Sequence, residues 1–327
     1  MTNRLMQLRA LWQPEMYHGW GVQKQYFEGW YLKCVTSDEK YAISFIPGIS
    51  MDGEGNQFAF VQVMFGTEGR SAFHRYAIAD FEPSEFRFDV KIGENRFSGE
   101  KIDLNLPGIK GVLSFSGNIE WPKMLGAPGI MGWFSYVPFM ECFHGIVSMN
   151  HQINGVLEID GQSVDFTNGK GYIEKDWGRS FPKAYVWMQS NHFGDAGASL
   201  IASVAHIPFL GSHFIGFISG FWLEGKLFRF ATYTGARKKL TILENHIELS
   251  FTNPKTAIHI RAHRAPGTAL ISPLSGAMTG KINESLQARI DVELTQNGKR
   301  IFEGTGTTAG LEVCLPPDDA EGKVLTR

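Results

Sequence analysis

Cysteine is scarce in this chain of 327 residues, and Cys34, Cys142 and Cys314 lie far apart. Three separated cysteines encode neither a disulfide framework nor a clustered zinc site, and they fit a reducing compartment. The first twenty residues also lack the apolar core of about 7–15 residues that a secretion signal contains. We therefore expect a cytoplasmic protein.

An excess of charge of one sign is also missing. Lys and Arg total 31 against 33 for Asp and Glu, which gives a formal net charge of -2. No basic run stands out as the stripe that neutralises phosphates in a nucleic-acid binder, so we expect no nucleic-acid partner. Nothing in the sequence indicates the oligomeric state.

The longest uncharged run extends from Leu200 to Leu223 and is long enough to cross a bilayer as a helix. Pro208, Gly216 and Gly220 interrupt it, and its β-branched and aromatic residues favour strands. The run therefore predicts two buried strands joined at the stretch HIPFLGSH rather than a membrane span.

Long helical patterns are rare, whereas strand and turn signals recur. The chain has 37 Gly and 13% aromatic residues, a composition that favours tight turns and sheets. Apolar residues alternate with polar ones over 86–92 and 102–106, as in half-buried strands. Hairpin turns are predicted at Asp160-Gly161, Glu224-Gly225 and Asn297-Gly298. Short helices are expected only in the first dozen residues and over 283–290, where a strand is the alternative.

The segment 121–145 mixes Pro, Gly and aromatic residues without clear periodicity, and it predicts a connector. We expect an all-β chain of two antiparallel barrels or bent sheets, over 20–140 and 141–315, followed by a tail over 316–327. The connector contains Trp133, Phe134, Tyr136 and Phe139. These side chains form either the lip of a pocket, a peripheral membrane contact or ordinary core.

Motifs of several enzyme classes are absent. The sequence contains no Gly-x-Ser-x-Gly elbow, and the glycine-rich stretches at 276–281 and 304–310 do not have the spacing of phosphate loops. His144 and His151, like His259 and His263, lack the sequence context in which such spacing indicates metal ligands. We therefore expect no metal and no cofactor.

The most unusual segment is 169–193, in which charged residues lie beside aromatic ones. Glu174, Lys175 and Asp176 precede Trp177. A strand over 184–191 places four further residues on one face, namely Tyr185, Trp187, Gln189 and Asn191. The alternative interpretation is a solvated turn followed by ordinary core aromatics.

A second acidic candidate lies in FEGWYLK at 27–33, where Glu28 is flanked by Phe27, Trp30 and Tyr31. A carboxyl group among aromatic rings loses hydration, which raises its pKa and lets it act as an acid near neutrality. The alternative is that Glu28 pairs with an arginine or accepts hydrogen bonds from backbone amides.

FEGWYLK, GYIEKDWGRSFPKAYVWMQSNHF and AGLEV at 309–313 together resemble the tocopherol cyclase family, whose broader relatives include carotenoid hydratases. The resemblance implies two lipocalin-like β domains around an apolar interdomain cavity. It points first to Glu174, because hydratase-like relatives also carry an acidic residue there. Asp176 departs from the plant pattern, which has Asn at this position.

The resemblance implies acid catalysis without a cofactor on a prenylated phenol, quinol or other isoprenoid. Glu174 would protonate an alkene, with Glu28 as the reserve acid and Asp176 as a further catalytic candidate. Trp177 and Trp187 would stabilise the carbocation, and Gln189 and Asn191 would orient the attacking oxygen. The remaining expected substrate contacts are Trp30, Tyr31 and Lys175. A noncatalytic isoprenoid-binding protein is the alternative, and it would tolerate Gln at position 174.

Overall fold

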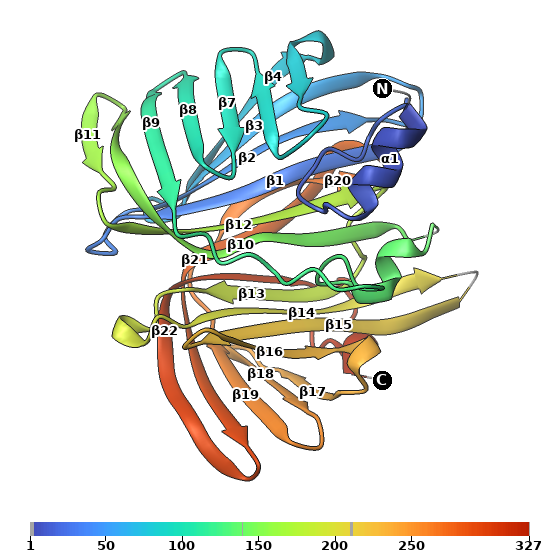
Figure 1. The fold of residues 1–327 in the computed structure, drawn as a ribbon, viewed down its shortest axis with the longest axis vertical. Helices are drawn as coiled ribbons and strands as arrows, with labels where there is room; N and C mark the ends of the chain where they lie inside the picture. Colours follow the sequence, from blue (N-terminus) through green and yellow to red (C-terminus); the bar gives the residue numbers. More distant parts are fainter. Residues whose placement is uncertain (1–2, 139, 210–211, 327) are drawn as a thin grey trace. The chain divides into compact units, whose positions relative to one another are not determined.

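The computed structural model describes residues 3–138, 140–209 and 212–326, and strands dominate its ribbon (Figure 1). The chain forms two compact units. The first unit contains residues 1–181 and 270–281, and the second contains 182–269 and 282–327. Antiparallel sheets with few short helices confirm the all-β prediction.

The first sheet has twelve strands in the order β4-β3-β2-β1-β12-β10-β9-β8-β7-β6-β5, with β11 paired to β10. Its strands are β1 (Tyr26–Val35), β2 (Ala42–Met51), β3 (Gln57–Phe65), β4 (Arg70–Ala77), β5 (Phe81–Pro83), β6 (Asp89–Ile92), β7 (Asn95–Ser98), β8 (Lys101–Leu106), β9 (Ile109–Ser116), β10 (Cys142–Ile159), β11 (Gln162–Asp165) and β12 (Gly169–Gly178). The helical segments in the same part of the chain are α1 (Asn3–Leu11), η1 (Ile78–Asp80) and η2 (Gly132–Tyr136).

The second sheet has ten strands in the order β16-β15-β14-β13-β22-β21-β19-β18-β17, with β20 paired to β21. Its strands are β13 (Tyr185–Ser190), β14 (Ser199–Phe209), β15 (Ser212–Leu223), β16 (Lys226–Ala231), β17 (Arg237–Ile242), β18 (His246–Thr252), β19 (Thr256–His263), β20 (Thr268–Leu274), β21 (Ala277–Gln296) and β22 (Lys299–Cys314). The helical segments between and after these strands are η3 (Gly194–Ala196), η4 (Thr232–Thr234) and α2 (Lys323–Thr326).

The division between the units falls after Phe181, not in the connector near residue 140. Strands β10 and β12 lie beyond that connector in sequence, yet they pair with β9 and β1 of the first sheet. The segment 270–281 also belongs to the first unit. The side chain of Gln62 donates to Ile271 O (3.2 Å) and accepts from Ile271 N (2.9 Å), and Ser50 Oγ donates to Gly276 O (2.7 Å).

The three predicted two-residue turns are confirmed. Both residues have positive φ in Asp160-Gly161 (49° and 79°), Glu224-Gly225 (47° and 81°) and Asn297-Gly298 (52° and 76°). Two central residues with positive φ match the right-handed twist of the flanking strands, so each turn closes a hairpin. Helix α1 confirms the helix expected in the first dozen residues, and 283–290 is strand, within β21.

The strand predicted over 86–92 begins only at Asp89, and Phe86 is 54% exposed. Ser84 explains the late start. Its hydroxyl oxygen accepts a hydrogen bond from Phe86 N (3.2 Å), and the backbone N of Ser84 donates to Asp89 O (2.8 Å). These two bonds close a turn over the residues where the strand was predicted to begin. The strand predicted over 102–106 is confirmed in β8.

Each unit has its own hydrophobic core on one face of its sheet. In the first unit, Trp30 and Leu32 of β1 and Ile173 and Trp177 of β12 belong to this core. In the second unit, Val186 and Met188 of β13 do so. Neighbouring residues of a strand face opposite sides of the sheet. The residues next in sequence to these core residues therefore lie on the face of the sheet away from the core.

The uncharged run 200–223 forms β14 and β15, as predicted, although its junction at Leu210 and Gly211 lies outside the described residues, as does Phe139. Among the described residues, no helix is both long and apolar enough to cross a membrane.

Candidate functional site

Strand β12 carries the acidic segment predicted from the sequence, and it divides that segment between two faces. Lys175 lies on the core face with Ile173 and Trp177, whereas Glu174 and Asp176 lie on the opposite face. Tyr31 of β1 is the register partner of Glu174. The three charged neighbours in sequence therefore belong to two separate clusters.

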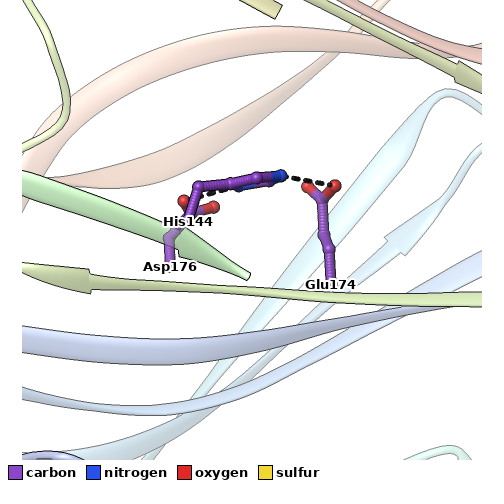
Figure 2. Close-up of side chains that lie close together, drawn as sticks. All are labelled: His144, Glu174 and Asp176. Carbon is purple, nitrogen blue, oxygen red and sulfur yellow. Dashed lines mark hydrogen bonds and ion pairs between the residues drawn. The ribbon is translucent and has the colours of Figure 1, made fainter. Parts of the chain in front are cut away.

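The first cluster, the acid cluster, contains Glu174, Asp176 and His144 of β10. The register of β10 on β12 pairs His144 with Asp176. His144 Nδ1 lies 2.9 Å from Asp176 Oδ1, and its Nε2 lies 3.5 Å from Glu174 Oε2. Figure 2 shows the imidazole between the two carboxylates, with one ring nitrogen directed at each.

Burial strengthens the electrostatic coupling within the acid cluster. Glu174 is 5% exposed and accepts a hydrogen bond from Tyr172 OH (2.5 Å). Burial lowers the pKa of His144, but the carboxylates of Asp176 and Glu174 outweigh it and raise that pKa to about 9. The cluster therefore holds a proton on or beside His144 at neutral pH.

The acid cluster also offers the donor set of a divalent metal. One imidazole nitrogen and one oxygen from each carboxylate lie within 4.8 Å of one another. The two ring nitrogens of His144 face different carboxylates, however, and Nδ1 is already hydrogen-bonded to Asp176. The imidazole therefore has a hydrogen bond to Asp176 on one side and a longer ion-pair contact of 3.5 Å to Glu174 on the other.

Sequence reasoning missed His144, because it considered this residue only together with His151. His144 and Asp176 are 32 positions apart, and only the pairing of β10 with β12 brings them together. The alternation within β12 was a usable signal, since it separates Lys175 from both acids.

The second cluster, the buried ion pair, contains Glu28 of β1 and Lys175. Lys175 Nζ lies 2.5 Å from Glu28 Oε1, and neither side chain has exposed surface. Glu28 also accepts from Tyr26 OH (2.5 Å) and from the backbone N–H groups of His18 (2.9 and 3.0 Å) and Gly19 (3.1 Å). Its oxygens are thus fully engaged.

The expectation that Glu28 remains protonated is wrong in direction. Burial alone raises the pKa of Glu28, as predicted, but the Lys175 ammonium and the hydrogen bond and charge of His18 lower it further. Burial also lowers the pKa of Lys175 to about 8, against the opposing effect of Glu28. Glu28 is therefore the ionised partner of Lys175, which takes the place of the arginine in the alternative interpretation.

Lys175 fixes the chain segment that follows α1. Its Nζ donates to Pro14 O (3.1 Å) and to Met16 O, and it lies 2.6 Å from His18 Nδ1. A side chain at Gly145 would collide with this segment, since a Cβ atom there would lie 3.0 Å from Pro14 Cβ. Glycine at position 145 thus lets the segment pack on the sheet.

The two tryptophans expected to contact substrate in the first unit pack into its core. Trp177 stacks on His18 (4.1 Å between ring centroids) and on Phe143 (5.5 Å). Trp30 stacks on Phe88 (5.4 Å) and has no exposed surface. Both rings lie within 5 Å of Lys175 Nζ, at 4.9 Å for Trp30 and 4.6 Å for Trp177. The cation that they stabilise is therefore Lys175.

The other predicted contacts belong to the second unit. Trp187 and Gln189 lie on β13, as predicted, and Asn191 follows its last residue. All three are buried. The register of β22 pairs Trp187 with Glu312, and Glu312 also pairs with Glu284 of β21. Sequence reasoning missed both carboxylates, of which Glu284 is 2% and Glu312 8% exposed.

Comparison with known proteins relates the chain to cyclases. The probable tocopherol cyclase, chloroplastic, of Oryza sativa subsp. japonica is 28% identical over 198 residues, which are 56% of this chain and 41% of that protein. The tocopherol cyclase, chloroplastic, of Zea mays is 26% identical over 194 residues, with the same coverage. The chain thus spans about two fifths of the length of these curated relatives.

Solved structures share the fold. The crystal structure of CghA with Sch210972 superimposes with a TM-score of 0.55 at 12% identity, covering 89% of this chain and 88% of that one. The model of the tocopherol cyclase-like family matches residues 114–315, which include β12, β13 and β22. The chain therefore belongs to the tocopherol cyclase-like family.

Proposed function

We propose that this protein is a cofactor-independent enzyme that cyclises or hydrates an isoprenoid by protonating one of its alkenes, with Glu174 as the acid. A prenylated phenol or quinol, held in an apolar cavity, is the substrate class. The observation that carries the proposal is the line of Asp176, His144 and buried Glu174 in a member of this family.

His144 and Glu174 share one proton in this proposal. With no substrate the proton resides on His144, in keeping with its raised pKa of about 9. An apolar substrate lowers the polarity around Nε2 and Glu174 Oε2, which lie 3.5 Å apart, and so disfavours a charge on each group. The proton then moves to Glu174, and the pair becomes neutral. Asp176 keeps the imidazole oriented through Nδ1.

The reaction balances without any other reagent. The carboxyl proton of Glu174 adds to one alkene carbon, and the other carbon becomes a carbocation. In cyclisation the phenolic oxygen bonds to this carbon, and its proton returns through His144 to the Glu174 carboxylate. In hydration a water oxygen takes the place of the phenol, and one water is added to the product.

A noncatalytic isoprenoid-binding protein is the second candidate. It is compatible with the contacts of Trp177 and Trp30, because both rings pack in the core beside Lys175 and neither needs a carbocation to stabilise. Such a protein needs no ionisable group at position 174 and would bind the ligand equally well with glutamine there.

The deciding experiment incubates a prenylated hydroquinone with wild type and Glu174→Gln and analyses the products by mass spectrometry. A wild-type product of unchanged mass indicates cyclisation, and a gain of one water indicates hydration. We expect Glu174→Gln to lose turnover while retaining its circular dichroism spectrum and its ligand affinity. The same assay with a chelator tests whether a metal in the acid cluster is required.

Glu312→Gln is the matched control, because it neutralises a buried carboxylate of the second unit. It should retain activity. Full activity of Glu174→Gln, with or without loss in Glu312→Gln, would contradict the assignment of the acid. Binding without turnover in the wild type would favour the second candidate.

A further inference from the structure

We propose that α1, together with loop residues packed near it, forms a docking surface for an anionic lipid bilayer. We call this surface the docking face. It consists of eight large apolar side chains that are each at least 38% exposed, namely Leu5, Leu8, Trp12, Phe86, Met124, Leu125, Trp133 and Tyr136. These eight are most of the thirteen exposed large hydrophobic residues among those the structure describes.

Helix α1 has apolar residues on two sides. Met6 and Ala10 are buried against the unit, as expected for residues one helical turn apart. Leu5 (55% exposed), Leu8 (60%) and Trp12 just beyond the helix (43%) share another side, because their spacing of three and seven residues returns to one face. The first side explains why α1 packs on the unit, and the second has no such role.

Three contacts bring the loop residues of the docking face next to α1 or to the residues that follow it. The rings of Trp12 and Tyr136 lie 5.8 Å apart, edge to face. The guanidinium of Arg9 lies 5.1 Å above the ring of Phe86. Lys123, beside Met124 and Leu125, pairs with Glu15 at 2.7 Å. Leu125 is 96% exposed, so its side chain projects almost entirely into solvent.

The charges of α1 indicate the sign of the partner. The helix carries Arg4 and Arg9 and no acidic residue. Leucine beside arginine, with tryptophan and tyrosine at the edge, is the composition of segments that lie in the headgroup region of a membrane. Anionic lipids attract such arginines, and the apolar side chains then enter the acyl boundary.

A bilayer fits this surface better than a second copy of the chain does. A symmetric dimer brings the same patch of two subunits together, and it would gather Arg4 and Arg9 of both subunits at one contact. Like charges at such a contact are repulsive, whereas a negatively charged bilayer neutralises them.

The buried ion pair explains how the docking face is held in place. His18 Nε2 lies 3.0 Å from Ala10 O near the end of α1, and His18 Nδ1 lies 2.6 Å from Lys175 Nζ. The helix is thereby tied to β12, the strand that carries Glu174. The proposal stands on exposure and charge, so it holds for a catalyst and for a binding protein alike.

The test is co-sedimentation of the full chain with vesicles of phosphatidylcholine that contain about 30% phosphatidylglycerol. The wild type should bind these vesicles, and Leu5→Glu/Leu8→Glu should bind at least tenfold more weakly. Both leucines are exposed, so the variant should fold normally by circular dichroism. Leu243→Glu/Ile301→Glu changes two comparably exposed residues of the second unit and should bind like the wild type.

Arg4→Gln measures the electrostatic contribution to vesicle binding. It should weaken binding to the anionic vesicles about fivefold and leave binding to pure phosphatidylcholine unchanged, because one arginine near an anionic surface contributes about 1 kcal/mol. Absence of wild-type binding, or equal binding by Leu5→Glu/Leu8→Glu, overturns the proposal. A dimer in light scattering that Leu8→Glu dissociates, without vesicle binding, would assign the face to a second copy instead.

Discussion

Glu174 and Lys175 are adjacent in sequence, yet their side chains lie on opposite faces of β12 and serve different ends. Lys175 enters the core and binds Glu28, whereas Glu174 lies beside His144 on the other face. The segment Glu-Lys-Asp therefore contributes residues to two clusters, Lys175 to the buried ion pair and the two acids to the acid cluster. One cluster ties α1 and the segment after it to the sheet, and the other holds the proton that the proposed mechanism uses.

The buried ion pair predicts a large loss of stability when one partner is removed. Lys175→Met leaves the Glu28 carboxylate charged in a fully buried site, so the free energy of unfolding should fall by about 3–5 kcal/mol. Lys91→Met is the control, because Lys91 pairs with Glu82 at 2.8 Å but both side chains are about half exposed or more. It should cost less than about 1 kcal/mol. Urea unfolding measures both values, and equal losses would contradict a structural role for the pair.

The acid cluster predicts how activity depends on pH. Turnover should fall as the pH rises through about 9, because His144 then loses the proton that it supplies to Glu174. Asp176→Asn removes one of the carboxylates that raise the pKa of His144, so this limb of the kcat profile should move to lower pH by about one unit.

A pH profile separates this role of Asp176 from a merely structural one. Loss of folding lowers activity at every pH and does not move the limb. An Asp176→Asn profile that coincides in shape with that of the wild type would exclude coupling between Asp176 and His144. His144→Gln should abolish the fall in turnover at alkaline pH, along with most of the activity.

The sequence predicts local structure well where short-range chemistry determines it. The turns at Asp160-Gly161 and Asn297-Gly298 were predictable because a two-residue hairpin requires residues that tolerate positive φ. Helix α1 and the strand predicted over 184–191, which is β13, followed from short-range patterns as well. The division between units was not predictable in this way, because it depends on which distant strands pair.

The acid cluster was predictable only in part, for the same reason. Glu174 could be identified from its own segment, but His144 reaches it through a register that includes irregularities between Ile146 and Ser148 and between Ser148 and His151. A bulge shifts which side chains face each other, and no local pattern encodes it. The error about Glu28 has a related cause, because its aromatic neighbours in sequence suggested desolvation while its partner Lys175 comes from another strand.

His144 should also stabilise the fold in a pH-dependent manner. Its pKa of about 9 lies above the ordinary 6.5, so the folded state binds this proton more tightly than the unfolded chain does. The stabilisation is complete below pH 6.5, disappears as the pH rises through 9, and amounts to about 3 kcal/mol. The difference in unfolding free energy between wild type and His144→Gln should therefore shrink by about this amount from pH 6 to pH 9.5. A difference that stays constant across this range would refute the assignment.

His151 of β10 should produce the opposite dependence on pH. It is 1% exposed, and burial lowers its pKa to about 3. The folded state therefore keeps the imidazole neutral, while the unfolded chain takes up a proton below pH 6.5, so folding becomes less favourable as the pH falls from 6.5 toward 3. Between pH 7 and pH 4 this one residue should cost the wild type about 3 kcal/mol.

His151→Leu tests this cost directly, since leucine keeps an apolar side chain beside Phe115, whose ring centroid lies 4.5 Å from that of His151. The variant lacks the hydrogen bond between Nδ1 and Ser148 Oγ (3.1 Å), which lowers its stability equally at both pH values. Its loss of stability from pH 7 to pH 4 in urea unfolding should be smaller than that of the wild type by about 3 kcal/mol. His259→Leu, at an exposed histidine of the second unit, is the control and should lose as much stability from pH 7 to pH 4 as the wild type does. If His151→Leu also loses as much stability as the wild type, the buried imidazole does not resist protonation.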